Sequence, residues 1–167
     1  MNRLFNNRKN NRKNSFNGQS VVEFALAFPI MLMVIIGIFE SGRLLVIYTT
    51  SVSASRAAAR FGTSVGTGDS GLPHYSDCNG MRERAMSIGV LSGIEPADIA
   101  ITYLIPDEVM PALCGTVSTD DLVFGSRIQV VVVGHYQPIS YFSNFFPNFN
   151  IVSESRRTIL KGVQFND

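Results

Sequence analysis

Apolar side chains dominate one long stretch near the start of the chain. Phe24–Phe39 contains no charged residue and consists mostly of large aliphatic, Met and Phe side chains. Apolar character returns over Leu44–Ile47, so residues 19–47 supply a helix long enough to cross a bilayer. The pattern predicts a transmembrane helix. A core helix of a soluble domain is the alternative, but such a helix ordinarily carries a polar face.

After this stretch the pattern changes to one typical of an α+β domain. Helical spacing continues to Gly62, where a loop rich in Gly, Ser, Thr and Asp ends the helix. Apolar and polar residues then alternate at helical and strand periods in turn. The predicted elements are a short helix over 80–91, N-capped by Asp77 or Asn79, and three antiparallel strands over 99–105, 127–136 and 151–163.

The predicted strands differ in their expected burial. Val130–Val133 is an unbroken β-branched run, which is typical of a central strand buried on both faces. Residues 151–163 are more polar and predict an edge strand. The expected fold is therefore α+β: a long N-terminal transmembrane helix that continues into a head with a short helix and about three antiparallel strands.

A strip of small residues follows the apolar run along the long helix. Ala54, Ala57 and Ala58 share one region of the helix surface. Two interpretations remain open: the strip packs on the protein's own sheet, as amphipathic helices normally do, or it lets the helix of a second subunit approach closely.

Charge is distributed unevenly around the apolar run. The segment before Gly18 holds five Lys and Arg residues and no acidic residue, whereas the charges after the run are sparser and partly balanced. This asymmetry predicts a cytoplasmic N-terminus and an external C-terminal part. A basic tail that binds nucleic acid or anionic lipid is the alternative. Removing the five basic residues changes the formal charge from +1 to −4, so we expect no nucleic-acid partner.

A secretory signal is a second way to explain the same stretch. Val52–Ala54 resembles a small-residue cleavage site that follows an apolar segment. The apolar stretch is longer than the core of an ordinary signal, and cleavage there would discard a third of the chain.

Glu23 lies just inside the apolar helix, where a carboxylate is unfavourable without a partner. One explanation places Glu23 at the level of the lipid headgroups, where the cost is small. Another explanation is that Glu23 has a positively charged partner, because cleavage after Gly18 would create an α-amino group on Gln19, one helical turn from Glu23. The amine of one subunit could also pair with Glu23 of a neighbour and so set the register of packed helices.

Several segments together resemble a known family. Gly18–Phe24 followed by the apolar run is similar to a class III signal of the type IV pilin superfamily. More narrowly, Val22–Leu26 with Pro29, then Gly37–Arg43, resembles the TadE-like family, the minor pilins or pseudopilins of the tight-adherence (Flp) pilus system. Ala57–Gly62 resembles the alanine- and arginine-rich end of the family's long helix.

The resemblance implies that three segments of the chain have different roles. Residues 1–18 would be a basic leader, 19–47 the transmembrane and assembly helix, and 48–167 an extracytoplasmic head. A prepilin peptidase would cut between Gly18 and Gln19. The mature protein would then meet other pilin or pseudopilin subunits and inner-membrane pilus assembly proteins.

Two residues of this motif bear on its role. Glu23 would orient assembly, as the glutamate of the family does. Phe24 stands where the major pilin of this system usually has tyrosine, and this departure fits a pseudopilin better than the main filament subunit. The resemblance thus implies a single-pass inner-membrane protein with a cytoplasmic N-terminus and a periplasmic or extracellular C-terminal domain, which can be incorporated in a pilus.

Cys78 and Cys114 are the two cysteines of the chain, and the predicted topology places both outside the cytoplasm. A pair of cysteines in an oxidising compartment most often forms a disulfide. Two free thiols are the alternative. Two thiols and two scattered histidines lack the close spacing of a zinc site, so no metal is expected.

Motifs of enzymes are present only in unsuitable contexts. Gly66–Gly71 contains a GxGxxG pattern, but no strand precedes it and a proline follows. Gly68–Gly71 spells the GDSG of a chymotrypsin-like serine protease, yet both His74 and His135 lie downstream of it. We therefore expect no enzyme, no catalytic residue and no cofactor, and a structural role for His135.

An aromatic segment over 141–149 contains four Phe and one Tyr. It is either a lid folded onto the sheet or an exposed patch for a protein or membrane partner.

The alternative to the pilus role is an uncleaved single-pass membrane protein with a periplasmic binding or sensory domain.

Overall fold

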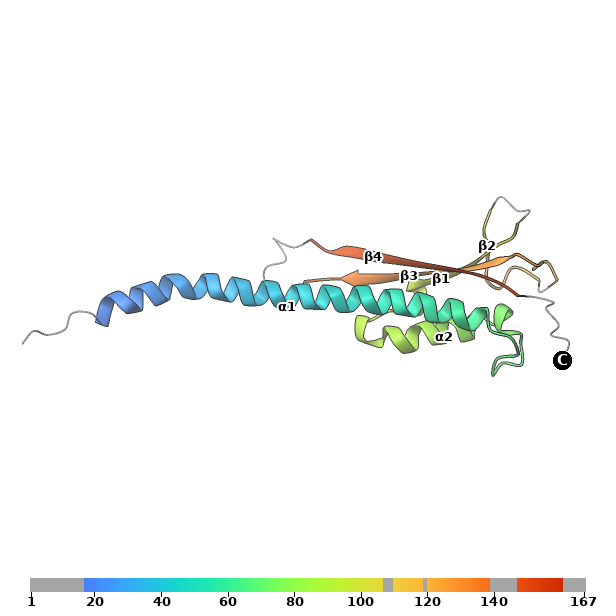
Figure 1. Ribbon diagram of the computed structural model, residues 1–167, viewed down its shortest axis with the longest axis horizontal. Coiled ribbons are helices and arrows are strands. Elements are labelled where there is room, and N and C mark those ends of the chain that lie inside the picture. Colours follow the sequence, from blue (N-terminus) through green and yellow to red (C-terminus); the bar gives the residue numbers. More distant parts are fainter. Residues whose placement is uncertain (1–16, 107–109, 119, 139–146, 161–167) are drawn as a thin grey trace, which may run out of the picture. The chain divides into compact units, whose positions relative to one another are not determined.

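The computed structural model describes residues 17–106, 110–118, 120–138 and 147–160. The predicted leader up to residue 16, most of the aromatic segment 141–149 and the end of the last predicted strand lie outside these residues. Figure 1 shows a long helix that runs beside a small sheet over its C-terminal half. The elements are α1 (Asn17–Gly62), α2 (Cys78–Gly89), the short 3-10 helices η1 (His74–Ser76), η2 (Val90–Ser92) and η3 (Pro96–Asp98), and the strands β1 (Ile99–Leu104), β2 (Ala112–Leu113), β3 (Arg127–Tyr136) and β4 (Phe149–Thr158).

The chain divides into two compact units, residues 1–39 and 40–167. The first contains the N-terminal half of α1, and the second contains the rest of α1 and all other elements. The second unit begins at Glu40, inside the predicted segment 19–47. Glu40 and Ile47 are already buried in this second unit.

The sheet has four antiparallel strands in the order β2-β1-β3-β4. β3 is central and pairs along its whole length with β4, from Arg127 opposite Thr158 to Tyr136 opposite Phe149. On its other side β3 pairs with β1, where Ile101 lies opposite Val130. The predicted α+β class, long helix and antiparallel sheet are thus confirmed.

One face of this sheet packs on helices. Alternate β3 residues, including Ile128, Val130 and Val132, are fully buried, as the two-residue period of a strand requires. α1 contributes alanines and α2 contributes Met81 and Ala85 to the same core. Ala54 and Ala58 are fully buried there. Ala54 and Ala58 of the small-residue strip therefore pack in the protein's own core, as the first of its two interpretations expects, whereas Ala57 is half-buried.

Gly134 of β3 lies directly against α1. A Cβ atom added at Gly134 would fall on the Ser51 side chain and 2.9 Å from Ile47 Cγ2. A glycine here lets the backbone of a strand reach the helix surface without a side chain between them.

Three strand predictions need correction. Val131 and Val133 are half-buried instead of buried, because no described layer covers the second face of the sheet. β2 is an additional strand that the sequence pattern does not predict, since two residues are too few to show an alternation. β4 begins at Phe149, two residues earlier than predicted, because pairing with Tyr136 extends it. Among the described residues the sheet thus has four strands instead of about three.

Candidate assembly site

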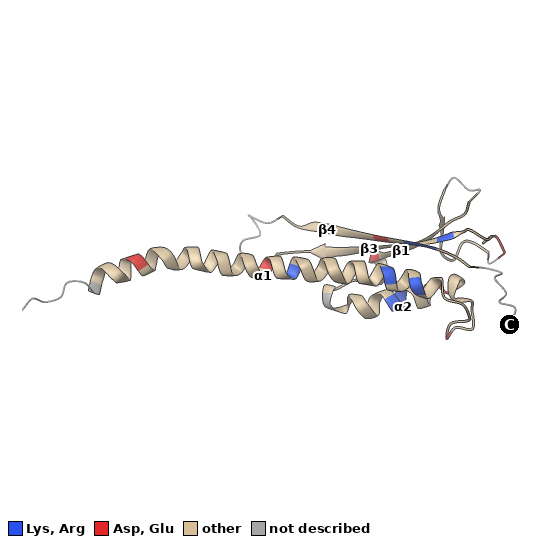
Figure 2. Cartoon of the chain, in the orientation of Figure 1, with Lys and Arg blue, Asp and Glu red and all other residues tan. Residues whose placement is uncertain are grey.

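The N-terminal half of α1 presents its apolar side chains to the outside. Val22, Phe24 and Leu26 are each at least 60% exposed, and the exposure continues to Phe39 at 72%. Figure 2 shows a long stretch of α1 without a charged residue between the first acidic position and the next. In the described residues, one helix, Gly18–Gly62, is long and apolar enough to cross a membrane. Such exposure in an ordinary soluble chain would be a large unpartnered apolar surface.

Gly18 stands at the first turn of this helix. The helix begins at Asn17, and a Cβ atom added at Gly18 would meet no atom within 4 Å. The fold itself therefore accepts a larger residue at this position. Any strict need for glycine would have to come from another molecule that reads the segment.

Gln19 and Glu23 lie one helical turn apart and are in direct contact. The Gln19 side-chain amide donates a hydrogen bond from Nε2 to Glu23 Oε1 at 3.1 Å. Both residues are exposed. The i, i+4 spacing alone brings the two side chains together on the helix surface.

Two further residues of the predicted site lie on the next turns. Phe24 packs against Phe28 with ring centroids 5.5 Å apart. Pro29 lies inside α1, and the helix continues past it. Because proline has no N–H, the backbone carbonyl one turn earlier loses its helical donor.

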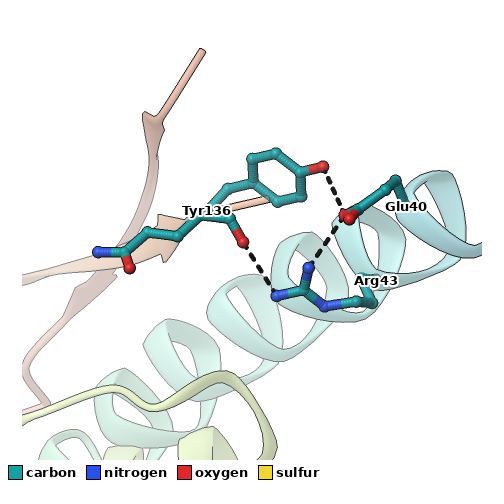
Figure 3. A network of polar contacts seen from close by, with 4 residues as sticks. Glu40, Arg43 and Tyr136 are labelled. Carbon is teal, nitrogen blue, oxygen red and sulfur yellow. Dashed lines mark hydrogen bonds and ion pairs between the residues drawn. The ribbon is translucent and has the colours of Figure 1, made fainter. Parts of the chain in front are cut away.

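A buried polar network marks the start of the second unit. Glu40 is 6% exposed, although it follows directly after the apolar run. Its Oε2 atom accepts hydrogen bonds from Arg43 Nη1 and from the Tyr136 hydroxyl, both at 2.9 Å. Arg43 also donates through Nη2 to the Gln137 backbone oxygen at 3.1 Å. Figure 3 shows Glu40 and Arg43 reaching from α1 to the end of β3.

These contacts explain how a carboxylate is tolerated in this position. A buried carboxylate is costly unless it is paired and hydrogen-bonded, and Glu40 has both a cationic and a neutral donor. Burial, and then the hydrogen bond to Glu40, raise the pKa of Tyr136. The Arg43 guanidinium also lies 5.8 Å from the centre of the Tyr136 ring.

Only one contact of this network can be predicted from the sequence. The spacing of Glu40 and Arg43 predicts that they share a helix face, and they do form an ion pair. Tyr136 follows Glu40 by 96 residues, and no local pattern connects them. The one available signal was a carboxylate at the end of an apolar run, which needs a partner.

A second polar cluster lies at the same end of β3, on the other face of the sheet. His135 contacts Asp98 Oδ1 through Nε2 at 2.7 Å and Asn150 Oδ1 through Nδ1 at 2.9 Å. Hydrogen bonds to Asp98 and then to Asn150 raise the pKa of His135. His135 thereby connects η3, β3 and β4.

The two cysteines join α2 to the segment after β2. Cys78 and Cys114 form a disulfide with their Cα atoms 5.9 Å apart. Tyr103 lies beside this bond, and its hydroxyl contacts Cys114 Sγ and donates to the Tyr75 backbone oxygen. Burial raises the pKa of Tyr103 to about 12.

The loop after α1 uses its polar groups for its own structure. Asp77 caps α2 through a hydrogen bond from the Gly80 N–H at 2.9 Å, and it also accepts from the Ser70 hydroxyl. His74 packs edge-on against Phe61 instead of contacting Ser70. In the described part of the chain, no group of three or more His, Cys, Asp or Glu residues is placed to hold a metal ion.

Comparison with known proteins bears directly on α1. Residues 18–60 match the family model described as TadE-like protein. This confirms the resemblance read from the motifs of that segment. No curated protein and no solved structure matches the chain.

The TadE-like segment coincides with nearly the whole of α1, from Gly18 to Arg60. It contains Gln19, Glu23 and the Glu40–Arg43 pair. The sheet, the disulfide and Tyr136 lie beyond it. The family likeness therefore covers the helix. It suggests that the chain is a single-pass membrane protein associated with a Tad pilus.

Proposed function

We propose that this protein is a minor pilin, or pseudopilin, that takes part in assembling a Flp/Tad-type pilus for surface adherence. A prepilin peptidase removes residues 1–18, and the mature chain begins at Gln19. Glu23 orients the chain during assembly, and the apolar helix that follows packs with other pilin or pseudopilin subunits. The protein acts as a structural subunit and not as an enzyme.

One coincidence carries this proposal. The TadE-like segment begins at Gly18, and this residue lies in the first turn of a helix whose apolar side chains are exposed over more than five turns. A helix of this kind needs either lipid or other helices around it. In a pilus system it would have lipid before assembly and neighbouring subunits afterwards.

The proposal also gives the protein a place and a set of partners. The N-terminus lies in the cytoplasm, the helix spans the inner membrane, and residues 48–167 lie on the external side, where the disulfide is stable. Partners are the peptidase, pilin and pseudopilin subunits, and inner-membrane assembly proteins.

Substitution of Gly18 tests the processing step. G18R should leave a longer precursor that is not assembled, because the peptidase would no longer accept the residue before the cut. N17R adds the same charge one position earlier and should still be processed. Intact mass from a membrane fraction gives the length of each variant.

Substitution of Glu23 tests the assembly step separately. E23Q should be cut normally but should be depleted from sheared pili, whereas E83Q, which alters an exposed glutamate of α2, should behave as wild type. Full assembly of both G18R and E23Q would contradict the proposal. That result would favour the uncleaved single-pass protein with a periplasmic binding or sensory domain.

A further inference from the structure

The proposed cut would give the mature chain a reactive end. An N-terminal glutamine carries an amine and a carboxamide in one residue, so its amine can attack its own Cδ atom. A new C–N bond then forms, the bond from Cδ to Nε2 breaks, and ammonia leaves with no oxidant or reductant required. The product is pyroglutamate, which has no basic amine. Intramolecular reactions of this kind are fast when the geometry permits them.

In the structure the carboxamide of Gln19 is engaged by Glu23. The Gln19 side chain extends toward the next turn, where Nε2 donates to Glu23 Oε1 at 3.1 Å. For cyclisation, this side chain would have to turn back toward its own nitrogen and give up the hydrogen bond. Around Gln19 and Glu23 the neighbouring helix side chains are mostly apolar, so little water would be available to replace the lost partner once the helix is in a membrane.

The α-amino group of the mature chain would further oppose cyclisation. It would lie one turn from Glu23 and pair with the carboxylate as an ammonium, and a protonated amine cannot attack Cδ. Glu23 has a second oxygen, Oε2, for this contact.

We infer that Glu23 protects the mature N-terminus at Gln19 from cyclisation to pyroglutamate. This inference rests on the proposed cleavage after Gly18. It gives Glu23 a chemical role before assembly, in addition to orienting the chain during assembly. Loss of the amine would remove the positive charge on which the proposed orientation depends.

The test follows the mature N-terminal peptide by mass spectrometry. Full-length wild type and the E23A, E23Q and Q19M variants are expressed with the peptidase, purified in detergent and incubated at neutral pH. Cyclisation lowers the peptide mass by one ammonia molecule, whereas methylation of the amine raises it by one methylene group. Q19M is the matched control, because it keeps the chain length but has no carboxamide to lose.

The wild-type peptide should begin at Gln19 and lose ammonia slowly. E23A should lose it at least about tenfold faster, the factor supplied by one hydrogen bond to a charged group. E23Q keeps a neutral acceptor and should fall between the two, which preserves the comparison if E23A is poorly inserted.

Equal rates in wild type and the Glu23 variants would overturn the inference while leaving the proposed cleavage intact. A wild-type peptide already cyclised on purification would do the same. A wild-type chain that begins at Met1 would instead overturn the proposed function, and with it this inference.

Discussion

Glu40 is a carboxylate that the fold buries at the start of the second unit, and Arg43 and Tyr136 are donors that stabilise it there. Arg43 supplies a charge-assisted bond and Tyr136 a neutral one, each at 2.9 Å. A buried carboxylate has lost its hydrogen bonds to water, so removing a donor leaves an unsatisfied acceptor. The loss of either donor should therefore lower the free energy of unfolding by more than its small contact area suggests.

Y136F removes one of these donors without changing the packing of the ring. We expect the free energy of unfolding to fall by about 1–3 kcal/mol, and the melting temperature to fall by about 2–4 °C for each kcal/mol. Thermal unfolding of the full chain in detergent measures the change. Y48F removes the hydroxyl of an exposed tyrosine and should change little; equal losses in both variants would contradict the network.

His135 should make stability depend on pH. The hydrogen bonds to Asp98 and Asn150 raise the pKa of His135 above its ordinary value of about 6.5. Its stabilising effect is therefore fully present below the unfolded pKa and is lost as pH rises through the folded pKa. Burial pushes the pKa of Asp98 up, but bonds from His135 and the Glu95 N–H lower it overall, so the Asp98 contribution is lost in acid.

The melting temperature of wild type should consequently exceed that of H135Q by more at about pH 6 than at about pH 8. Thermal melts across this range, with D98N as a second way of breaking the pair, measure the difference. A gap between wild type and H135Q that widens toward high pH would contradict the assigned contact.

At the scale of elements, the second unit depends on how closely α1 lies to β3. Ala54 and Ala58 are fully buried on the helix, and Gly134 on the strand leaves no room for a Cβ atom beside Ser51 and Ile47. Close packing of this kind leaves little room for even one additional carbon atom.

G134A should destabilise the protein by about 1–3 kcal/mol, because the new Cβ overlaps Ser51 and presses on Ile47. G42A is the matched control: it adds the same atom to α1 where no atom lies within 4 Å, and it should be neutral or stabilising by up to about 1 kcal/mol. Chemical denaturation compares the two. A neutral G134A would show that helix and strand are not in contact there.

The disulfide makes a separate contribution to the second unit. It closes a loop of 36 residues, for which the chain-entropy model gives roughly 4 kcal/mol. Reducing agent should lower the melting temperature of wild type and leave that of the C78S/C114S variant unchanged. A wild type that is insensitive to full reduction would indicate that the bond adds no stability.

The sequence allowed the regular elements to be predicted and left the contacts between them open. α1 and β3 follow from long runs with a clear period, and β3 was predicted with the same bounds as observed. β2 has two residues, too few for any period. In the candidate site, Gly18, Gln19 and Glu23 could be named because they belong to one local motif. Tyr136 could not, because tertiary folding alone brings it to Glu40.

At the scale of the whole molecule, the chain consists of two units with different surfaces. Residues 1–39 carry the exposed apolar helix, and residues 40–167 carry the sheet, its core and the disulfide. Loss of the basic leader would change the formal charge from +1 to −4, so the basic character belongs to the precursor. The central claim is that this precursor is processed.

Intact mass combined with N-terminal peptide analysis of the protein from a membrane fraction tests that claim most directly. We expect a chain that begins at Gln19 in cells with an active prepilin peptidase, and one that begins at Met1 when the peptidase is deleted. A chain that begins at Met1 in both cells would contradict the account. A chain that begins near Ser55 would contradict it as well, since the apolar helix would then be a discarded signal.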